Sequence, residues 1–369
     1  MHKIKMLSLI RFFLSQSISV LMYTIIFLAG CSGSRSSNNL SNEVDIYVAG
    51  YEFSGDLKIA KYWKNGIPAL LSNGVTAGVA TSIFCNQSDL YIVGREFDEN
   101  LIGPVAKIWK NGLQTALTDG STDAEINSVW ISGNDVYVAG GEAAYAPNVG
   151  ANAEYWKNTN KVKLTDGTHS AMARAITVSD GNVYVAGDEL EIVSTGPITN
   201  ELVSVARIWK NGIPMTLDLK SGLNSGATGT VVTGSDVYVV GWETENTGYG
   251  DRVLARLWKN GQLIPMTGNE DSIATSIAIS SNDIYVVGYK YIGNSSVAMC
   301  WKNGQGAQLA DGKVSSIANS IAILGGNVYI AGFEGNYAKY WINGTSRNLT
   351  NGKFSASANS IFIIQRKLK

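Results

Sequence analysis

Hydrophobic positions between residues 44 and 364 come in short runs that are separated by glycine-rich polar segments. Runs such as IYVVG (284–288) and VYVAG (136–140) are rich in β-branched and aromatic residues, which is typical of strands. Asn-Gly and Asp-Gly pairs stand between many of the runs, and 40 glycines are spread along the chain. Because glycine weakens helix interiors and Asn-Gly favours tight hairpins, the pattern predicts an all-β fold.

The same unit returns seven times. Its first half ends on a Tyr-x-x-Gly string, and its second half ends on a tryptophan that Lys-Asn-Gly usually follows. The tyrosines are Tyr47, Tyr91, Tyr137, Tyr184, Tyr238, Tyr285 and Tyr329, and the tryptophans are Trp63, Trp109, Trp156, Trp209, Trp258, Trp301 and Trp341. Successive tyrosines are 44 to 54 residues apart, and a period of this size indicates a repeat architecture.

One copy divides into four predicted strands, which we name A to D. In the sixth copy, strand A covers Ser276–Ile279, strand B covers Ile284–Gly288 and strand C covers Val297–Trp301, while strand D begins at Gln308. Tight turns separate A from B and C from D, whereas the connections from B to C and from D to the next A vary in length. Four antiparallel strands of this size form one blade of a β-propeller.

The first copy has no strand A, because residues 44–50 already match strand B. A strand A pattern without a partner, Ser360–Ile364, follows the last complete copy. We therefore predict a seven-bladed propeller over residues 44–369, in which the C-terminal strand completes blade 1. Such closure removes the exposed sheet edges that invite aggregation.

Glycine and tryptophan suggest a register for strands B and C. If Gly50 faces Trp63, the indole covers a residue without a side chain, and Glu52 then faces Lys61. Opposite charges occur at these positions in five copies: Glu52/Lys61, Glu96/Lys107, Glu189/Arg207, Glu243/Arg256 and Glu334/Lys339. The third copy has Glu142 and Glu154 there, and the sixth has Lys290 and Met299. We interpret these pairs as marks of register, each worth about 0.2–1 kcal/mol, and not as catalytic carboxylates.

The N-terminal segment carries Lys3, Lys5 and Arg11, then a mostly apolar stretch, Phe12–Leu28, then Leu28-Ala29-Gly30-Cys31. This is the pattern of a secretory signal peptide over residues 1–30, although an uncleaved membrane helix is the alternative. The four residues from Leu28 to Cys31 resemble the lipobox of bacterial lipoproteins. The resemblance implies cleavage before Cys31, a diacylglycerol on its sulfur and a fatty acid such as palmitate on its amine. Two or more acyl chains suffice for stable membrane anchoring.

Residues 32–43 (SGSRSSNNLSNE) are polar, and with Cys31 they form a predicted lipidated tether over residues 31–43. Ser32 follows the cysteine where an aspartate would imply inner-membrane retention. The resemblance therefore implies a bacterial cell envelope protein anchored in the outer membrane, on its periplasmic or its surface side.

Charge and motifs limit the function classes. The net charge is −1, and no basic stripe appears, so we expect no nucleic-acid partner. His169 is the one histidine outside the leader, and we expect it at the surface. No His/Cys group has zinc spacing, the Asp-Gly pairs have the chemistry of turns, and glycine-rich phosphate loops are missing. We assign no cofactor, no metal ligand and no catalytic residue, and we expect Cys85 and Cys300 to be buried free thiols.

Variable B–C loops are the candidate binding elements. The longest are residues 143–153, 190–206 and 244–255, in the third, fourth and fifth copies. Variable loops on a rigid scaffold often bind partners, but long loops are also tolerated because they cost little. We expect a binding scaffold for an envelope protein or glycan. The alternative is a carbohydrate-active or other hydrolytic propeller, with carboxylates converging near the central channel.

The Trp-Lys-Asn-Gly and Tyr-Val-Ala-Gly strings, with the Leu-Thr-Asp-Gly segments at 117–120 and 164–167, resemble repeats of uncharacterised bacterial extracellular proteins called HAF repeats. The resemblance covers nearly all of residues 44–364. The chain departs from that family in lacking the His-Ala-Phe segment. The resemblance implies a secreted repeat protein and no particular activity.

Overall fold

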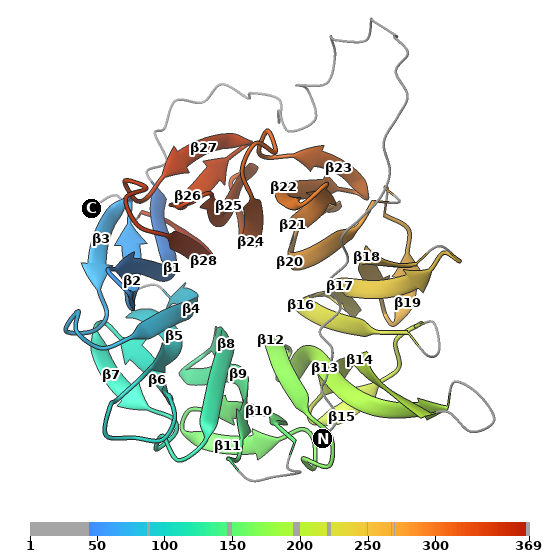
Figure 1. The fold of residues 1–369 in the computed structure, drawn as a ribbon, viewed down its shortest axis with the longest axis horizontal. Coiled ribbons are helices and arrows are strands. Elements are labelled where there is room, and N and C mark those ends of the chain that lie inside the picture. The colour runs from blue at the N-terminus through green and yellow to red at the C-terminus, as the bar shows by residue number, and fades with distance from the viewer. Residues whose placement is uncertain are drawn as a thin grey trace, which may run out of the picture. The chain divides into compact units, whose positions relative to one another are not determined.

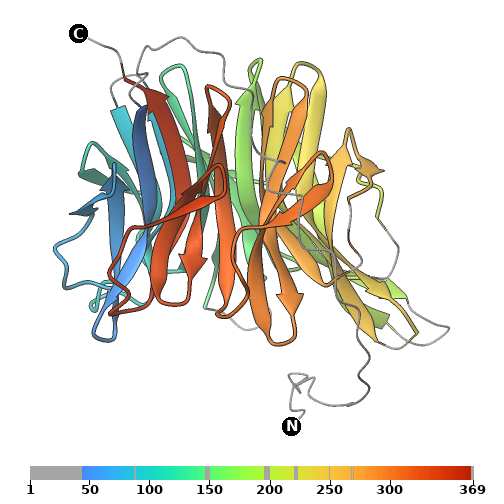
Figure 2. The ribbon, with the colours of Figure 1, turned by 90° about the horizontal axis from the view of Figure 1, so that it is seen from above.

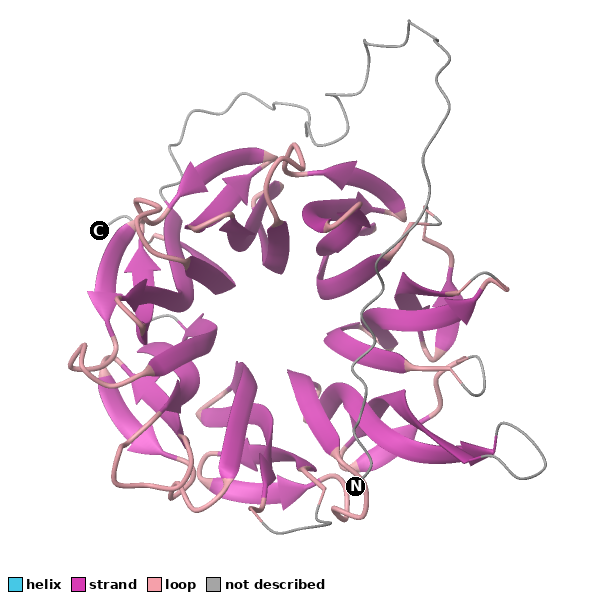
Figure 3. Ribbon diagram, viewed as in Figure 1, coloured by secondary structure: helices cyan, strands magenta, loops and turns pink. Residues whose placement is uncertain are grey.

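The computed structural model describes residues 44–86, 89–145, 150–194, 200–219, 223–248, 250–266, 268 and 270–366. These residues form seven antiparallel sheets of four strands each, set as blades around a central channel (Figure 1). Within them there are strands and connections but no helix (Figure 3), and so none long and apolar enough to cross a membrane. The predicted seven-bladed all-β propeller is confirmed.

Each blade runs from an innermost strand A to an outermost strand D. Blade 1 comprises β28 (Ala356–Gln365), β1 (Val44–Ser54), β2 (Leu57–Lys64) and β3 (Ile67–Leu70). Blade 2 comprises β4 (Gly78–Asn86), β5 (Asp89–Glu96), β6 (Val105–Lys110) and β7 (Leu113–Ala116). Blade 3 comprises β8 (Asp123–Ser132), β9 (Asp135–Ala143), β10 (Asn152–Lys157) and β11 (Asn160–Lys163). Blade 4 comprises β12 (Ala171–Ser179), β13 (Asn182–Ser194), β14 (Asn200–Lys210) and β15 (Ile213–Met215).

The remaining blades follow the same order. Blade 5 comprises β16 (Ser225–Thr233), β17 (Asp236–Asn246), β18 (Asp251–Lys259) and β19 (Gln262–Ile264). Blade 6 comprises β20 (Ser272–Ser280), β21 (Asp283–Ile292), β22 (Ser295–Lys302) and β23 (Gln305–Gln308). Blade 7 comprises β24 (Ser316–Leu324), β25 (Asn327–Glu334), β26 (Tyr337–Ile342) and β27 (Thr345–Asn348).

The ring closes as the sequence predicts. Strand β28 pairs antiparallel with β1 from Val44↔Gln365 to Glu52↔Ala356. Arg366 adds a second link, because its Nε and Nη2 lie 3.0 and 2.7 Å from Oδ1 of Asp45. Burial would raise the pKa of Asp45, but hydrogen bonds from Asn65, Arg366 and Lys64 outweigh it and lower the pKa to about 2. The first and last described strands are thus joined by backbone pairing and by charge.

The predicted register of strands B and C is wrong by two residues. Gly50 faces Lys61, and Trp63 faces Val48. The two-residue turn at Gly55-Asp56 sets this register, because it places Ser54 opposite Leu57. Gly50 is required for a different reason. A Cβ there would lie 1.9 Å from the carbonyl oxygen of Ser357, at a bulge in the neighbouring strand β28.

The two faces of the ring differ (Figure 2). One, the short-turn face, carries the A–B and C–D turns, together with the start of β1 and the end of β28. In all seven blades, the asparagine after the strand C tryptophan reaches across to the start of strand B. In blade 1, Asn65 accepts from the Ile46 N–H at 2.8 Å and donates to Asp45 at 2.8 Å. The other, the loop face, carries the B–C connections and the D–A crossings.

The core lies between adjacent blades. Seven clusters of buried side chains each combine residues of two neighbours, and each contains one repeat tryptophan. Trp109 of blade 2, for example, packs against Tyr47 and Ala60 of blade 1. An indole buries up to about 250 Å², so these rings are a main source of blade-to-blade attraction. The repeat tryptophans therefore pack between blades.

Candidate functional site

Every blade has an ion pair that includes a strand B residue, in the half of the blade nearer the loop face. The five predicted pairs all form, diagonally across the corrected register, for instance Lys61 Nζ–Glu52 Oε2 at 2.6 Å and Arg256 Nε–Glu243 Oε2 at 3.1 Å. The two apparent exceptions are compensated from outside strands B and C. In blade 6, Lys290 pairs with Glu270 of the preceding crossing at 2.6 Å. In blade 3, Lys161 of β11 pairs with Glu142. Sequence reasoning missed Lys161 and Glu270, because neither occupies a repeat position.

Blade 3 brings two carboxylates together. Glu154 stands where other blades have a cation, and its Oε2 lies 3.6 Å from Lys161 Nζ, which also contacts Glu142. Glu154 is 1% exposed, and its Oε2 accepts no hydrogen bond from the described residues. Burial raises the pKa of Glu154 to about 7, against a smaller lowering by Lys163. Two carboxyl groups thus meet at one ammonium, but the one with the raised pKa is shielded from solvent.

The threonine and aspartate side chains of the Leu-Thr-Asp-Gly segments make hydrogen bonds that hold the D–A crossings in place. Thr118 Oγ1 accepts from the Ala106 N–H at 2.9 Å, and Thr165 Oγ1 accepts from the Ala153 N–H at 3.1 Å. Asp119 accepts from the Ser121 N–H at 2.9 Å, which closes a turn. The interpretation of these Asp-Gly pairs as turn chemistry is therefore confirmed. His169 lies half-buried in the crossing from blade 3 to blade 4.

Two of the three predicted B–C loops are largely regular hairpins. In blade 4, β13 and β14 stay paired as far as Ser194↔Asn200, so most of residues 190–206 form a two-stranded arm that extends from the ring (Figure 1). In blade 5, β17 and β18 pair as far as Asn246↔Asp251. Strand alternation continues through these segments, but the sequence signal is weak because their side chains are mostly half-exposed or exposed. The blade 3 connection, between Ala143 and Asn152, is not strand in the described residues.

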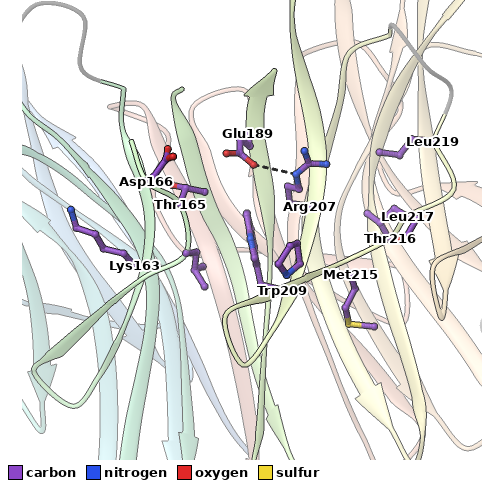
Figure 4. A pocket seen from close by; sticks show the side chains of 12 residues that line it. Lys163, Thr165, Asp166, Glu189, Arg207, Trp209, Met215, Thr216, Leu217 and Leu219 are labelled. Atoms are coloured by element: carbon purple, nitrogen blue, oxygen red, sulfur yellow. Dashed lines mark hydrogen bonds and ion pairs between the residues drawn. The ribbon is translucent and has the colours of Figure 1, made fainter. Parts of the chain in front are cut away.

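The base of the blade 4 arm borders a groove of about 700 Å³ on the loop face, between blades 3 and 4 (Figure 4). Blade 3 contributes residues 163–166. Blade 4 contributes Trp209, residues 214–217, Leu219 and the Glu189–Arg207 pair, whose Oε2 and Nε are 3.2 Å apart. Arg207 also contacts Glu191 on the arm. Equivalent grooves lie between blades 1 and 2, 2 and 3, and 5 and 6, and each contains a blade's ion-pair residues.

The central channel encloses about 500 Å³ and is lined by strand A of all seven blades. Its middle is polar: each strand A bulge turns one residue inward, and these are Thr81, Asn127, Arg174, Thr228, Thr275, Asn319 and Asn359. Three residues further along, toward the short-turn face, three adjacent blades supply Phe362, Phe84 and Trp130. No aspartate or glutamate is among the described lining residues. Asp188, outside this lining, forms an ion pair with Arg174, and the alternative prediction of carboxylates converging near the channel stays a prediction.

The remaining predicted site residues are placed as follows. Cys85 in β4 and Cys300 in β22 are buried and form no disulfide with a described residue, as expected. Cys31, with the rest of the leader and tether, lies outside the described residues. Within the described ranges, no group of three or more His, Cys, Asp or Glu side chains could hold a metal ion.

No protein-family model matches the chain, and no curated protein matches it. Solved structures with a similar fold include YjhT, with 11% identity, 77% of this chain and 96% of that chain covered, and a TM-score of 0.38. A mutant levansucrase from Bacillus subtilis has 7% identity, 62% and 84% coverage and a TM-score of 0.37. A mutant sialidase from Trypanosoma rangeli has 10% identity, 77% and 53% coverage and a TM-score of 0.42. Similarities this weak carry no argument about this chain.

Proposed function

We propose that the chain is a lipid-anchored binding protein of the bacterial cell envelope that recognises a protein or glycan partner through its loop face. The Leu28–Cys31 motif supports the anchor, with Cys31 as the lipidated residue. The outer membrane is the proposed location, on either its periplasmic or its surface side.

The position of Val44 supports this assignment of faces. Strand β1 begins there, paired with Gln365 at the end of β28, on the short-turn face. The twelve tether residues, 32–43, reach at most about 40 Å when fully extended. A lipid on Cys31 therefore draws the short-turn face toward the bilayer. The loop face, with its grooves and arms, then points away from the membrane toward partners.

The observation that carries the proposal is the concentration of irregular surface on the loop face. The short-turn face is nearly uniform, because in every blade the asparagine after the strand C tryptophan makes the same hydrogen bond to the start of strand B. The loop face combines the groove between blades 3 and 4 with the blade 4 arm, on which Ile192 and Leu202 form an exposed cross-strand pair. Variable apolar and charged groups on a rigid base are what partner recognition requires.

The anchor and the binding face are tested separately. Metabolic labelling with a palmitate analogue should mark the wild-type protein in the membrane fraction, and Cys31→Ser should abolish both the label and the membrane association. A soluble Cys31→Ser protein that keeps its label would contradict the anchor.

For the binding face, the full-length protein is cross-linked in intact cells beside a variant whose blade 4 arm is shortened by removing residues 191–203 and joining the strands with Asn-Gly. We expect loss of at least one cross-linked partner. Ile67→Ser, on the exposed start of β3 near the short-turn face, is the matched control and should retain all partners. Equal partner recovery by the wild type and the shortened variant would exclude the arm as a contact.

A further inference from the structure

We propose that the central channel is a binding site for a small, neutral, ring-shaped ligand with several hydroxyl groups, of the size of a monosaccharide. This site is separate from the loop-face function proposed above, and either can hold without the other. The channel volume of about 500 Å³ falls within the range of small-molecule sites.

One side of the channel is an aromatic wall. The rings of Phe84 and Phe362 have centroids 4.6 Å apart, and those of Phe84 and Trp130 are 5.3 Å apart. All three side chains are half-buried and line the channel. The other four blades have smaller residues at the same level: Thr177, Val231, Ala278 and Ala322. The channel is therefore an aromatic surface facing open space, which suits a flat ligand that places its C–H groups on ring faces of negative charge density.

Hydroxyl and amide groups stand next to this wall. Strand A of five blades has a serine two residues before the aromatic level, namely Ser82, Ser128, Ser276, Ser320 and Ser360. Ser360 Oγ accepts from the Ile83 N–H at 3.2 Å, and Ser82 Oγ accepts from the Val129 N–H at 3.2 Å. These bonds provide acceptors for backbone N–H groups on the inner edge of strand A, where no further strand pairs with it. Each such serine has an O–H and a further lone pair that no described contact uses, and both are suited to a ligand hydroxyl.

The bulge residues form a second polar level. Asn127 Nδ2 donates to the Ala173 carbonyl at 3.0 Å, and Asn319 Nδ2 donates to the Ala358 carbonyl at 3.0 Å. Their Oδ1 atoms are acceptors directed by these bonds. Among the described lining residues the one charged side chain is Arg174, which forms an ion pair with Asp188 through two nitrogens, so its charge is already compensated. Donors and acceptors without net charge favour an uncharged polyhydroxylated ligand over a carboxylate or an amine.

The full-length protein is tested for binding of glucose, mannose and N-acetylglucosamine, each up to about 10 mM, by calorimetry and saturation-transfer NMR, because sites of this kind can be as weak as millimolar. Glucuronate and indole serve as the charged and the purely aromatic probe. We expect at least one of the three neutral sugars to bind, and to bind more tightly than either probe. Absence of binding by all three, or preference for glucuronate or indole, would overturn the proposal.

Variants locate the site. Trp130→Ala and Phe84→Ala should each weaken binding about tenfold, equivalent to 1.4 kcal/mol. Since these changes also affect packing, Ala278→Trp is the decisive variant: it adds bulk opposite the wall, removes no contact of the wall, and should abolish binding. Ile67→Ser, on the exposed start of β3, is the control and should bind like the wild type. Undiminished sugar binding by a folded Ala278→Trp protein would place the ligand elsewhere and refute the channel site.

Discussion

Strand B of each blade has a glycine beneath the bulge of strand A. A Cβ at any of these seven positions would lie between 1.9 and 2.1 Å from a backbone carbonyl oxygen, which no local adjustment of a side chain can relieve. The positions are Gly50, Gly94, Gly140, Gly187, Gly241, Gly288 and Gly332. The bulge in turn directs one polar residue of strand A into the channel. One glycine per blade therefore leaves room for the bulge of strand A, and the bulge places a polar side chain in the channel lining.

This role predicts the cost of a single methyl group. Gly94→Ala should lower the free energy of unfolding by about 3 kcal/mol or more, because the new Cβ would lie 2.0 Å from the Val79 carbonyl oxygen. Gly55→Ala is the matched control. Gly55 has a φ of +61° but nothing within 4 Å of a new Cβ, so only the backbone conformation costs about 1–2 kcal/mol. Urea denaturation of both variants measures the difference, and equal losses would contradict the close-approach explanation.

Ionisation of the buried Glu154 side chain opposes folding. Its pKa is about 7 in the folded protein and 4.5 in the unfolded chain. Stability from this group is therefore complete below about pH 4.5 and is lost as the pH rises through 7. Lys161, 3.6 Å away, offsets part of the loss. Glu154→Gln should thus unfold like the wild type at about pH 4 and be about 1–3 kcal/mol more stable at about pH 8.

Urea titrations at the two pH values test this prediction. Glu201→Gln, an exposed acid at the start of β14, is the control and should show no pH-dependent gain. If Glu154→Gln were less stable than the wild type at the higher pH, the pair of Glu154 with Lys161 would be a net stabilising interaction and the burial argument would fail.

At the scale of the strand and its connections, hydroxyl groups of the D–A crossings complete strand C. Thr118 is buried and accepts from the Ala106 N–H at 2.9 Å, which would otherwise be a buried donor without a partner. Thr118→Val should cost about 1–3 kcal/mol in denaturation experiments, the price of an unsatisfied buried N–H. Thr115→Val on the exposed strand β7 should stay within about 0.5 kcal/mol of the wild type. Similar effects of the two changes would remove the assigned role of the Leu-Thr-Asp-Gly threonine.

Strand order and blade number could be predicted because they depend on local signals that repeat: the Tyr-x-x-Gly string, the Asn-Gly turn and the missing strand A at residue 44. The B–C register could not be predicted, since the B–C connections differ in length: two-residue turns join the strands in blades 1, 6 and 7, and longer connections join them in the other blades. The ion pairs of Lys161 with Glu142 and of Glu270 with Lys290 could not be predicted either, because Lys161 and Glu270 do not occupy positions that recur in the repeat. The sequence did contain one signal for such a pair: Glu154 stands where other copies have a cation, which indicates that a cation from elsewhere lies nearby.

Of the two candidate sites, one could be predicted from the sequence and the other could not. The loop face followed from loop length, which is visible in the sequence, although the blade 4 loop proved to be a hairpin arm. The channel lining did not follow, because Phe84, Trp130 and Phe362 are far apart in the chain and meet only when β28 closes the ring. Sites that arise from closure require knowledge of which copies are neighbours, and of which side of each strand faces inward.

For the whole molecule, closure is the property on which blade packing depends. Strand β28 contributes Ile361 and Ile363 to the core between blades 7 and 1, while Ser360 bonds to blade 2. A chain that ends before residue 356 would expose an edge of β1 and the inner faces of two neighbouring blades. We expect that truncated protein to aggregate or to lose cooperative unfolding.

Closure by pairing of β28 with β1 should tolerate a covalent link between these two strands, with new chain ends opened in another blade. Val44 and Gln365 are paired neighbours, so a short Gly/Ser linker can join the end of the chain to Val44, and new termini can be opened between Gly133 and Asn134 in the turn from β8 to β9. Blade 3 then contains the first and the last strand of the permuted chain, as blade 1 does in the original chain. This permuted protein should unfold in urea as one cooperative unit, within about 2 kcal/mol of the linear 44–369 chain, because every strand pair is retained. A permuted protein that fails to fold beside a truncated one that folds normally would show that the ring's stability resides in something other than the pairing of its first and last strands.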